Sequence, residues 1–397
     1  MAGGTLGTPS TLREACDLLP AATELRRAVH AHPELGLDLP HTQQLVLEAI
    51  GGLGLEVSTG SALSSVVAVL EGGQPGPTTL LRADMDALPM PEDTGLPYSS
   101  EVEGVMHACG HDAHVAMLAG AAKLVSHRRG EVRGRVIFMF QPGEEGHAGA
   151  RVMLEEGLLE LHGRVDRAFA LHITPIFASG SVHTRKGTMM ASSDKFRVVV
   201  RGRGGHASMP HDTVDPIPVA CEIVTSLQTM VTRRVPLFDP AVVTVAKVAA
   251  GTTFNVVPEI AVLDGTVRAL SPQTRDLVLE RLAEVAAHIA AAHMCTAEIS
   301  SPQDNYPVTV NDGAEAQRAL DVARGALGPG RADEMASPLM GAEDWSYVLE
   351  KVPGCIAFLG AAPPGEDKPA PNHSNKMTID EGAMAAGIAM YAAMALS

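Results

Sequence analysis

The nine residues from Met106 to His114 combine one cysteine with three histidines, namely His107, Cys109, His111 and His114. In a cytosolic protein, so dense a cluster of thiol and imidazole groups is more typical of a transition-metal site than of a disulfide. No CxxC pair accompanies the cluster, so its spacing is not that of a zinc finger. The pattern predicts a catalytic metal centre completed by ligands from distant segments or, as the structural alternative, a histidine-rich surface loop.

Carboxylates follow two other segments that have the pattern of buried strands. Asp84 and Asp86 come directly after the first of these strands, and Glu144 and Glu145 come directly after the second. Open α/β sheets bind ligands at the carboxyl ends of their strands, so a functional role stands beside simple loop capping for the two aspartates. The side chains of adjacent glutamates diverge, so one can bind a metal while the other holds a water molecule as general base.

A histidine, His172, ends the third expected strand. Three successive stretches therefore deliver a Cys, His or Glu side chain to what we expect to be one edge of a sheet, a recurrence that packing does not explain. The sequence thus predicts a polynuclear metal site. His373 stands alone in a polar loop and by itself would be a weak candidate ligand. His30 and His32 could be ligands, but a structural role or a place behind the metal ligands is favoured for them.

The elements that must position these residues alternate between helix and strand. Apolar spacing and Gly/Pro boundaries predict helices and strands in two sets. The helices are expected at 11–32, 40–53, 113–126 and 148–156, and the strands at 65–71, 78–83, 135–140 and 166–172. This order predicts an α/β domain with a central, mostly parallel sheet flanked by helices.

The pattern changes near Gly187. Strands are expected at 194–203, 241–249, 259–270 and 295–300, with helices at 216–233 and 272–293. The order βαββαβ predicts a ferredoxin-like α+β sandwich. We expect a discontinuous catalytic domain at 11–187 and 301–397, an inserted lid or dimerisation domain at 188–300, and disorder in residues 1–10.

Composition limits the classes of function. The chain has 397 residues, and its 30 Lys and Arg against 46 Asp and Glu give a net charge of −16, which makes nucleic acid an unfavourable partner. Its five cysteines are odd in number and scattered, so no disulfide framework is expected. The sequence shows neither a signal-peptide pattern nor an apolar run long enough for a membrane span. These features predict a cytoplasmic protein without a membrane partner.

Eight motifs, taken together and in this order, resemble those of the dinuclear metallo-aminoacylase/carboxypeptidase superfamily, closest to its branch of hippurate hydrolases and indole-acetyl-amino-acid hydrolases. They extend from about His30 to His373. The matching motifs are RADMDALPM, MHACGHDAH, FQPGEEG, ALH, GRGGHAS, GTTFNVVP, GAEDWSY and NHS.

The resemblance implies two divalent metal ions per chain, of which Mn, Zn, Co and Ni all suit such ligands. The implied ligands are Cys109, His111, Glu145, His172 and His373. Cys109 stands where most of the superfamily has a bridging aspartate. Glu144 matches the general base. Asp86 matches the catalytic carboxylate behind the metal ligands, whereas Asp84 stands where relatives place a histidine ligand.

Substrate contacts are implied outside the metal cluster. His206 resembles a lid histidine that reaches the substrate, in many relatives across a dimer interface, and has a catalytic role there as well. Asn255 and Arg268 match residues that hold the substrate carboxylate. Without the resemblance, Arg268 would be a surface charge on a strand and Asn255 a turn residue. The implied assembly is a homodimer through the lid domain, with a tetramer as the alternative.

The expected activity is metal-dependent cleavage of the amide bond in N-acyl amino acids such as hippurate. A dipeptidase or carboxypeptidase of the same superfamily is one alternative, and a non-catalytic metal-binding scaffold is another. A third alternative makes Cys109 a nucleophile beside a histidine base.

Overall fold

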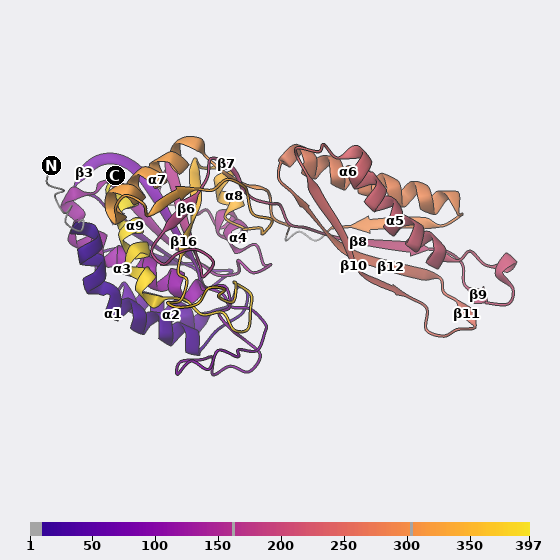
Figure 1. Cartoon of the computed structure of the whole chain (residues 1–397), viewed down its shortest axis with the longest axis horizontal. Helices are drawn as coiled ribbons and strands as arrows, with labels where there is room; N and C mark the ends of the chain where they lie inside the picture. The colour runs from indigo at the N-terminus through magenta and orange to yellow at the C-terminus, as the bar shows by residue number, and fades with distance from the viewer. Residues whose placement is uncertain (1–9, 161–162, 302–304) are drawn as a thin grey trace. The chain divides into compact units, whose positions relative to one another are not determined.

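The computed structural model describes residues 10–160, 163–301 and 305–397, which form two compact units (Figure 1). Unit 1 comprises Met1–Met189, Val310–Ser337 and Asp344–Ser397, and unit 2 comprises Met190–Thr309 and Pro338–Glu343. The segment predicted to be disordered, 1–10, lies outside the described residues except for Ser10, with which the first helix begins.

Unit 1 is built on an eight-stranded sheet with the strand order β1-β2-β4-β3-β5-β16-β6-β15. The four central strands β4, β3, β5 and β16 are mutually parallel, while β1, β2 and β6 join antiparallel to their inner neighbours. The expected α/β architecture with a mostly parallel sheet is confirmed. The strands are β1 (Glu56–Thr59), β2 (Val66–Glu71), β3 (Gln74–Asp84), β4 (Arg133–Gln141), β5 (Arg167–Thr174), β6 (Val182–Thr184), β15 (Ala332–Glu334) and β16 (Gly354–Gly360).

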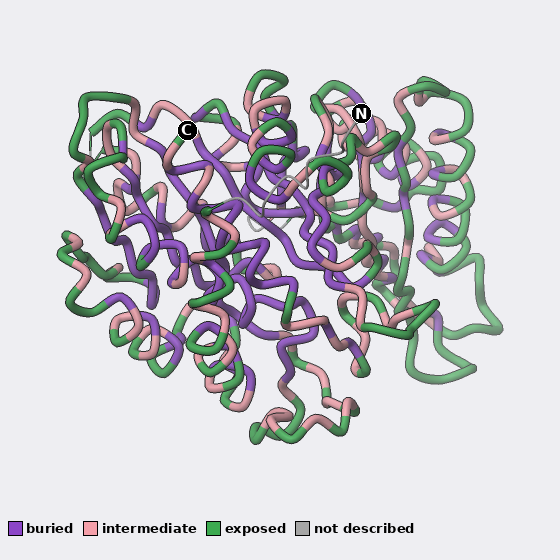
Figure 2. The backbone as a smooth tube through the Cα atoms, turned by 60° about the vertical axis from the view of Figure 1, so that its left-hand side comes forward, coloured by how far each residue is buried: buried purple, intermediate pink, exposed green. Residues whose placement is uncertain are grey.

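Two helices of unit 1, α3 and α9, are buried along most of their length (Figure 2). Both are rich in alanine and aliphatic residues on all sides, which suits helices that lie between a sheet and further helices. α3 packs on α1, α9 and β3, and α9 packs on α7. The helices are α1 (Ser10–Ala31), α2 (Pro40–Ala49), α3 (His111–His127), α4 (Gly149–Glu155), α7 (Gly313–Leu327), α8 (Ser346–Leu349) and α9 (Met384–Leu396), with short 3₁₀ turns at Arg129–Glu131 and Glu381–Ala383.

Unit 2 contains a four-stranded antiparallel sheet in the order β10-β12-β8-β13, packed against α5 and α6. The chain order βαββαβ with these neighbours is the predicted ferredoxin-like topology. Burial alternates along β8, where Phe196, Val198 and Val200 face the core. The elements are β8 (Asp194–Arg201), α5 (Pro216–Arg234), β10 (Ala241–Ala250), β12 (Ile260–Ala269), α6 (Pro272–Ala292) and β13 (Thr296–Ser300).

Two further pairs of short strands lie outside the two larger sheets. β9 (Gly205–His206) pairs with β11 (Val256–Val257), close to the 3₁₀ turn Pro210–Asp212 and at one end of the sheet of unit 2 (Figure 1). β7 (Gly187–Met190) pairs with β14 (Thr309–Asn311).

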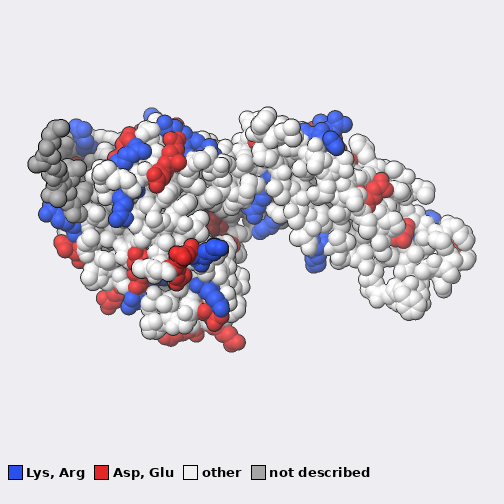
Figure 3. Space-filling model, in the orientation of Figure 1, with Lys and Arg blue, Asp and Glu red and all other residues white. Residues whose placement is uncertain are grey.

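The surface of unit 1 mixes acidic and basic side chains, whereas the face of unit 2 seen in Figure 3 has wide uncharged areas. Among the described helices, none has both the length and the apolar character needed to cross a bilayer.

Candidate metal centre

The loop between Cys109 and the start of α3 depends on glycine at position 110. Gly110 has φ +85°, a left-handed conformation, and a Cβ placed there would lie 2.5 Å from Cγ2 of Ile173. Hydrogen bonds from α1 also hold the first turn of α3 in place, because Asp112 accepts from Arg26 and His30. The side chains of Cys109 and His111 are therefore held on either side of one sharp bend.

The five predicted metal ligands lie together in unit 1. Cys109, His111 and His172 have ligand atoms within 4.8 Å of one another, and so do Cys109, Glu145 and His373. The two triads share the thiol of Cys109, which lies 3.4 Å from Nε2 of His172. His373 Nε2 lies 3.2 Å from Oε1 of Glu145. The elements that supply them are the loop before α3, the start of α3, the turn after β4, the end of β5 and the loop before α9.

Glu144 belongs to a third, overlapping triad. Its carboxylate lies within 4.8 Å of the ligand atoms of His111 and Glu145. The side chain is 6 % exposed, so it is more buried than those of the predicted ligands Glu145 and His373. The structure thus brings the predicted general base next to the predicted ligands.

Two of the histidines have a defined orientation. Nδ1 of His111 lies 2.8 Å from the carbonyl oxygen of Asp86, and Nδ1 of His172 lies 2.9 Å from that of Ile173. Because a carbonyl oxygen only accepts, each Nδ1 carries the proton, and in the neutral ring Nε2 presents a lone pair. Nε2 of His111 has no hydrogen-bond partner among the described residues. This is how histidines are usually oriented at metal sites.

The buried carboxylates around Cys109 and His111 favour the binding of a cation. Burial alone would lower the pKa of His111, but the carboxylates of Asp84 and Asp86 outweigh it and raise this pKa to about 10. A proton on His111 therefore balances part of the buried negative charge in the metal-free chain. Burial, followed by the carboxylates of Glu145 and Glu144, raises the pKa of the Cys109 thiol. Thiol, imidazole and carboxylate donors under a surplus of negative charge fit divalent transition metals.

The raised pKa of Cys109 argues against the cysteine-hydrolase alternative. A nucleophilic cysteine needs a neighbouring group that stabilises its thiolate. The carboxylates beside Cys109 act in the opposite sense, and its thiol is only 6 % exposed.

Asp86 fastens the turn that carries the two glutamates. Its Oδ1 accepts a hydrogen bond from the backbone N–H of Glu144 and its Oδ2 one from that of Glu145, both at 2.9 Å. One carboxylate at the end of β3 therefore sets the backbone of both residues after β4. The contacts of Asp86 are those of a residue that positions other groups.

Asp84 belongs to a buried polar network. It forms an ion pair of 2.7 Å with Arg82 and accepts a hydrogen bond from Nδ1 of His114. Nε2 of His114 accepts a hydrogen bond from the N–H of Ile173 at 2.7 Å. Asp84, His111 and His114 also lie within metal-binding distance of one another, but both nitrogens of His114 are already engaged.

Three members of this network, Arg82, Gln141 and Asp344, were not singled out from the sequence. Arg82 donates to Gln141 at 2.9 Å and to Asp344 at 3.0 Å, and Asp344 also accepts from the N–H of Ala150. Asp344 lies in the motif GAEDWSY, so its place in the resemblance was the only available signal. His30 bonds Asp112 and Glu92, which agrees with the structural role expected for it.

The predicted substrate residues lie in unit 2, at two separate places. His206 and Asn255 are neighbours, because Val256 pairs with His206 and the carbonyl of Asn255 accepts from the N–H of Ala207 at 3.1 Å. The stretch of β12 from Ile260 to Arg268 spans about 26 Å at about 3.3 Å per residue. Since β9 and β11 lie beyond the Ile260 end, unit 2 does not bring Arg268 together with the other two.

His206 and Arg268 differ in their surroundings. Nδ1 of His206 accepts a hydrogen bond from the N–H of Ser208 at 3.1 Å, so the neutral ring carries its proton on Nε2. The His206 side chain is exposed. Arg268 is half-buried, and the only hydrogen bond of its guanidinium among the described residues reaches the carbonyl of Ser192 at 3.5 Å. Its guanidinium therefore keeps donors for a further ligand.

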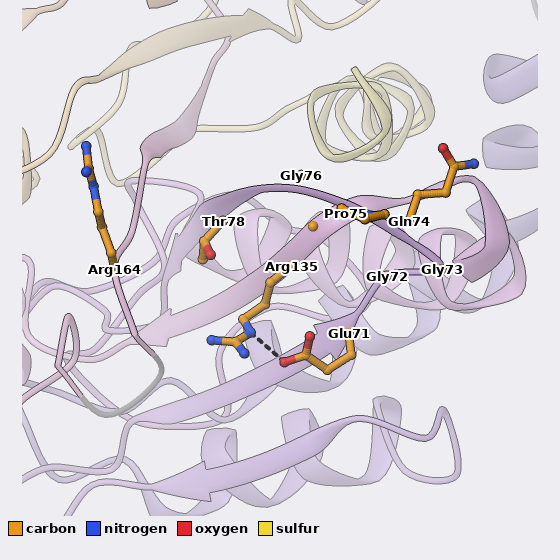
Figure 4. A pocket seen from close by; sticks show the side chains of 10 residues that line it. Glu71, Gly72, Gly73, Gln74, Pro75, Gly76, Thr78, Arg135 and Arg164 are labelled. Atoms are coloured by element: carbon orange, nitrogen blue, oxygen red, sulfur yellow. Dashed lines mark hydrogen bonds and ion pairs between the residues drawn. The ribbon is translucent and has the colours of Figure 1, made fainter.

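A surface hollow of about 550 Å³ lies at the other end of the central strands (Figure 4). It is lined by Gln74 and Thr78 at the start of β3 and by Arg135 at the start of β4. Its two arginines are paired, Arg135 with Glu71 and Arg164 with Asp166. The candidate metal ligands follow the opposite, carboxyl ends of these strands.

Curated relatives match almost the whole chain. It is 37 % identical over 376 residues to "Thermostable carboxypeptidase 1" of Saccharolobus solfataricus, covering 94 % of each protein. It is 38 % identical to "IAA-amino acid hydrolase ILR1-like 4" of Arabidopsis thaliana, covering 97 % of this chain and 87 % of that one. It is 37 % identical to "N-acetylcysteine deacetylase" of Bacillus subtilis, covering 94 % and 95 %.

Solved structures share the fold. A putative aminohydrolase from methicillin-resistant Staphylococcus aureus superposes with a TM-score of 0.90 at 30 % identity, covering 97 % of this chain and 98 % of that one. The Bacillus subtilis YXEP protein, described as a dinuclear metal-binding peptidase of the M20 family, has a TM-score of 0.83 at 33 % identity, covering 96 % and 98 %. The family model for "Peptidase family M20/M25/M40" matches residues 80–397. The resemblance carried by the motifs is thereby confirmed: the chain belongs to the peptidase family M20/M25/M40 and is a hydrolase.

Proposed function

We propose that this protein is a metal-dependent amidohydrolase that cleaves N-acyl amino acids into a carboxylic acid and a free amino acid. The observation that carries the proposal is the set of overlapping triads that share Cys109, His111 and Glu145, with Glu144 beside them. The names of two relatives, an N-acetylcysteine deacetylase and an IAA-amino acid hydrolase, support an N-acyl amino acid as substrate.

Two divalent cations per chain would be held by Cys109, His111, Glu145, His172 and His373. The description of the Bacillus subtilis structure as dinuclear supports this number. When bound, such cations would lower the pKa of the attacking water and polarise the substrate carbonyl. Mn, Zn, Co and Ni are all compatible with this mixed ligand set.

Glu144 is the proposed general base. It takes a proton from the attacking water and delivers it to the amine that leaves as the amide bond breaks. Asp86 holds the Glu144 backbone by a bond of 2.9 Å, which restricts where the carboxylate can reach. The low exposure of Glu144 keeps bulk water from competing for this proton.

The substrate would be held by three hydrogen-bond donors of unit 2. The guanidinium of Arg268 offers a bidentate fork to the α-carboxylate of the amino-acid half. Asn255, from a second copy of the chain, would add an amide that donates to the same substrate. The Nε2–H of His206 is a donor suited to the oxyanion that develops on the carbonyl, and loss of such a donor typically costs about 3 kcal/mol of transition-state stabilisation.

The spacing within unit 2 supports a homodimer as the working form. About 26 Å of strand separates Arg268 from the end where His206 and Asn255 lie, which exceeds the length of an N-acyl amino acid. Arg268 and His206 can serve the same substrate only if they come from different copies. We therefore propose that His206 and Asn255 act in trans.

The role of Glu144 is tested by comparing two adjacent isosteric variants. Glu144→Gln should lower turnover of N-acetyl and N-benzoyl amino acids at least about a hundredfold and leave the metal content unchanged. Glu145→Gln should lower the metal content itself. A Glu144→Gln protein that loses metal, or one that keeps full turnover, would refute the assignment.

Action in trans is tested with mixed dimers of two inactive variants, Glu144→Gln and His206→Ala. If His206 acts in trans, half of the dimers contain one complete site, and about a quarter of wild-type activity returns on mixing. If His206 acts within its own chain, every site lacks one residue and no activity returns.

A carboxypeptidase is the second candidate, favoured by the relative named Thermostable carboxypeptidase 1. The two candidates differ in the group attached to the carbonyl side of the cleaved bond. A panel that pairs N-acetyl amino acids with dipeptides of the same C-terminal residue separates them by the ratio of kcat/KM values. Loss of both activities on chelation excludes a metal-free mechanism, and no turnover with metal bound would favour the scaffold.

A further inference from the structure

Asn372 precedes the predicted ligand His373 and makes two hydrogen bonds to the backbone of other ligand-bearing segments. Its Nδ2 donates to the carbonyl of Cys109 at 3.0 Å and to the carbonyl of Ile173 at 3.1 Å. A side-chain amide has two N–H groups, and both are used here. A flipped amide would place its oxygen against two carbonyl oxygens, so the chemistry of the contacts fixes its orientation.

The peptide at Ile173 is held from two sides. Its carbonyl accepts from Asn372 and also from Nδ1 of His172 at 2.9 Å, while its N–H donates to Nε2 of His114 at 2.7 Å. The same carbonyl therefore sets both the ring of His172 and the loop that carries His373. A substitution of Asn372 should therefore alter the positions of two proposed ligands, His172 and His373.

The loop of His373 has little other support toward the site. His373 adopts φ +67°, which non-glycine residues rarely adopt, and its side chain is 55 % exposed. Its N–H donates to the carbonyl of Ala108 at 2.7 Å. That bond and the two bonds of Asn372 join the loop before α9 to the Cys109 loop and to the end of β5.

We propose that Asn372 is a positioning residue that joins the Cys109, His172 and His373 segments through hydrogen bonds that do not involve a cation. It donates only to backbone carbonyls and has no ligand role of its own. The inference rests on the proposed function in one respect, namely that these three side chains hold metal. Because Asn372 pre-orders the ligands, its loss should weaken cation binding far more than it weakens the fold.

The test uses the full-length protein after removal of metal. Binding of Zn²⁺ and of Mn²⁺ is measured by competition with a chromogenic chelator for wild type, Asn372→Ala and Asn372→Asp. For each metal, the more weakly bound of the two ions should bind to both variants about 10- to 100-fold less tightly than to wild type. This is the range typical of groups that orient metal ligands. Asn375→Asp makes the same chemical change three residues further along this loop and should leave the affinity unchanged.

A second readout separates positioning from a purely structural role. The chain has a single tryptophan, Trp345, which is fully buried in unit 1 and reports the unfolding of that unit. In excess chelator, the variants should unfold within about 1 kcal/mol of wild type, the net value of a typical hydrogen bond. Wild-type affinity in Asn372→Ala would overturn the inference, whatever its stability, and so would weakened binding in Asn375→Asp.

Should Asn372→Ala not fold, the isosteric Asn372→Asp decides alone, since it keeps the shape and replaces the NH2 group that donates both bonds by an oxygen facing two carbonyls. The outcome is independent of catalysis. A wild-type protein that binds two cations but hydrolyses no N-acyl amino acid would refute the proposed function and leave this inference standing. Wild type without cation uptake would refute the metal centre itself.

Discussion

Substitution of Gly110 by alanine should destabilise unit 1 through two separate effects. The first is conformational, since φ +85° costs an L-residue about 1–2 kcal/mol relative to glycine. The second is steric, because the new Cβ would lie 2.5 Å from Cγ2 of Ile173, and overpacking of a buried site costs about 1–3 kcal/mol. Together they predict a loss of about 2–5 kcal/mol in the free energy of unfolding.

The two effects can be separated by changing Ile173. Ile173→Ala removes Cγ2 while keeping the backbone bonds to His114 and Asn372, so in that background Gly110→Ala should cost only the conformational part, about 1–2 kcal/mol. Ile173→Val keeps Cγ2 and is the matched control, in which Gly110→Ala should cost as much as in wild type.

The measurement is urea unfolding followed by the emission of Trp345, which reports unit 1 alone. It is made in excess chelator, because bound metal would add its own stabilisation. The double-mutant cycle should give a coupling energy of about 1–3 kcal/mol between Gly110 and Ile173. Equal costs of Gly110→Ala in the wild-type and Ile173→Ala backgrounds would refute the steric argument.

Three further outcomes follow from the contacts of the site. Asp86→Asn turns an oxygen that accepts a backbone N–H into a donor, and should cost about 1–3 kcal/mol in unfolding free energy together with most of the turnover, measured by urea titration and by kcat. His206→Gln can present an amide N–H near the position of Nε2, whereas His206→Asn mimics Nδ1, so kcat of the glutamine variant should exceed that of the asparagine variant; the reverse order would mean that the other nitrogen donates. Burial alone would lower the pKa of His30, but Asp112 and Glu92 raise it to about 9, so the charged ring stabilises the fold fully below its unfolded value of about 6.5 and this contribution is lost as pH rises through about 9. Wild type should therefore lose up to about 3 kcal/mol between pH 6.5 and 9.5 that His30→Gln does not lose, and parallel pH curves would contradict this.

Long elements with a clear pattern were predictable from the sequence. The helix expected at 216–233 is α5, and the strand expected at 78–83 lies within β3. β16 (Gly354–Gly360) was not predicted, because periodicity alone does not distinguish its short apolar run from a segment of buried helix. The return of Pro338–Glu343 to unit 2, through a bridge between Leu339 and Met190, depends on a pairing of residues distant in sequence.

The site was predictable to the extent that it depends on residue type. Thiol, imidazole and carboxylate groups at strand ends identify candidate ligands, and their convergence follows from the parallel sheet. The bond between Asp84 and His114 could not be predicted, because His114 reaches Asp84 from α3, whereas Arg82 lies two residues away on the same strand. The bonds of Asn372 to Cys109 and Ile173 join residues up to 263 positions apart, a separation at which local pattern carries no information.

The order in which the polypeptide leaves the ribosome has a consequence for this enzyme. Nearly all of unit 2 is one continuous stretch, so it can fold as soon as its own residues have emerged. Unit 1 folds later, because its central sheet lacks β16 and its helical layer lacks α9 until residues 354–396 have been made. His373 arrives at the same late moment. The nascent chain therefore cannot bring its five candidate metal ligands together before residue 373, which follows the whole of unit 2, has been made.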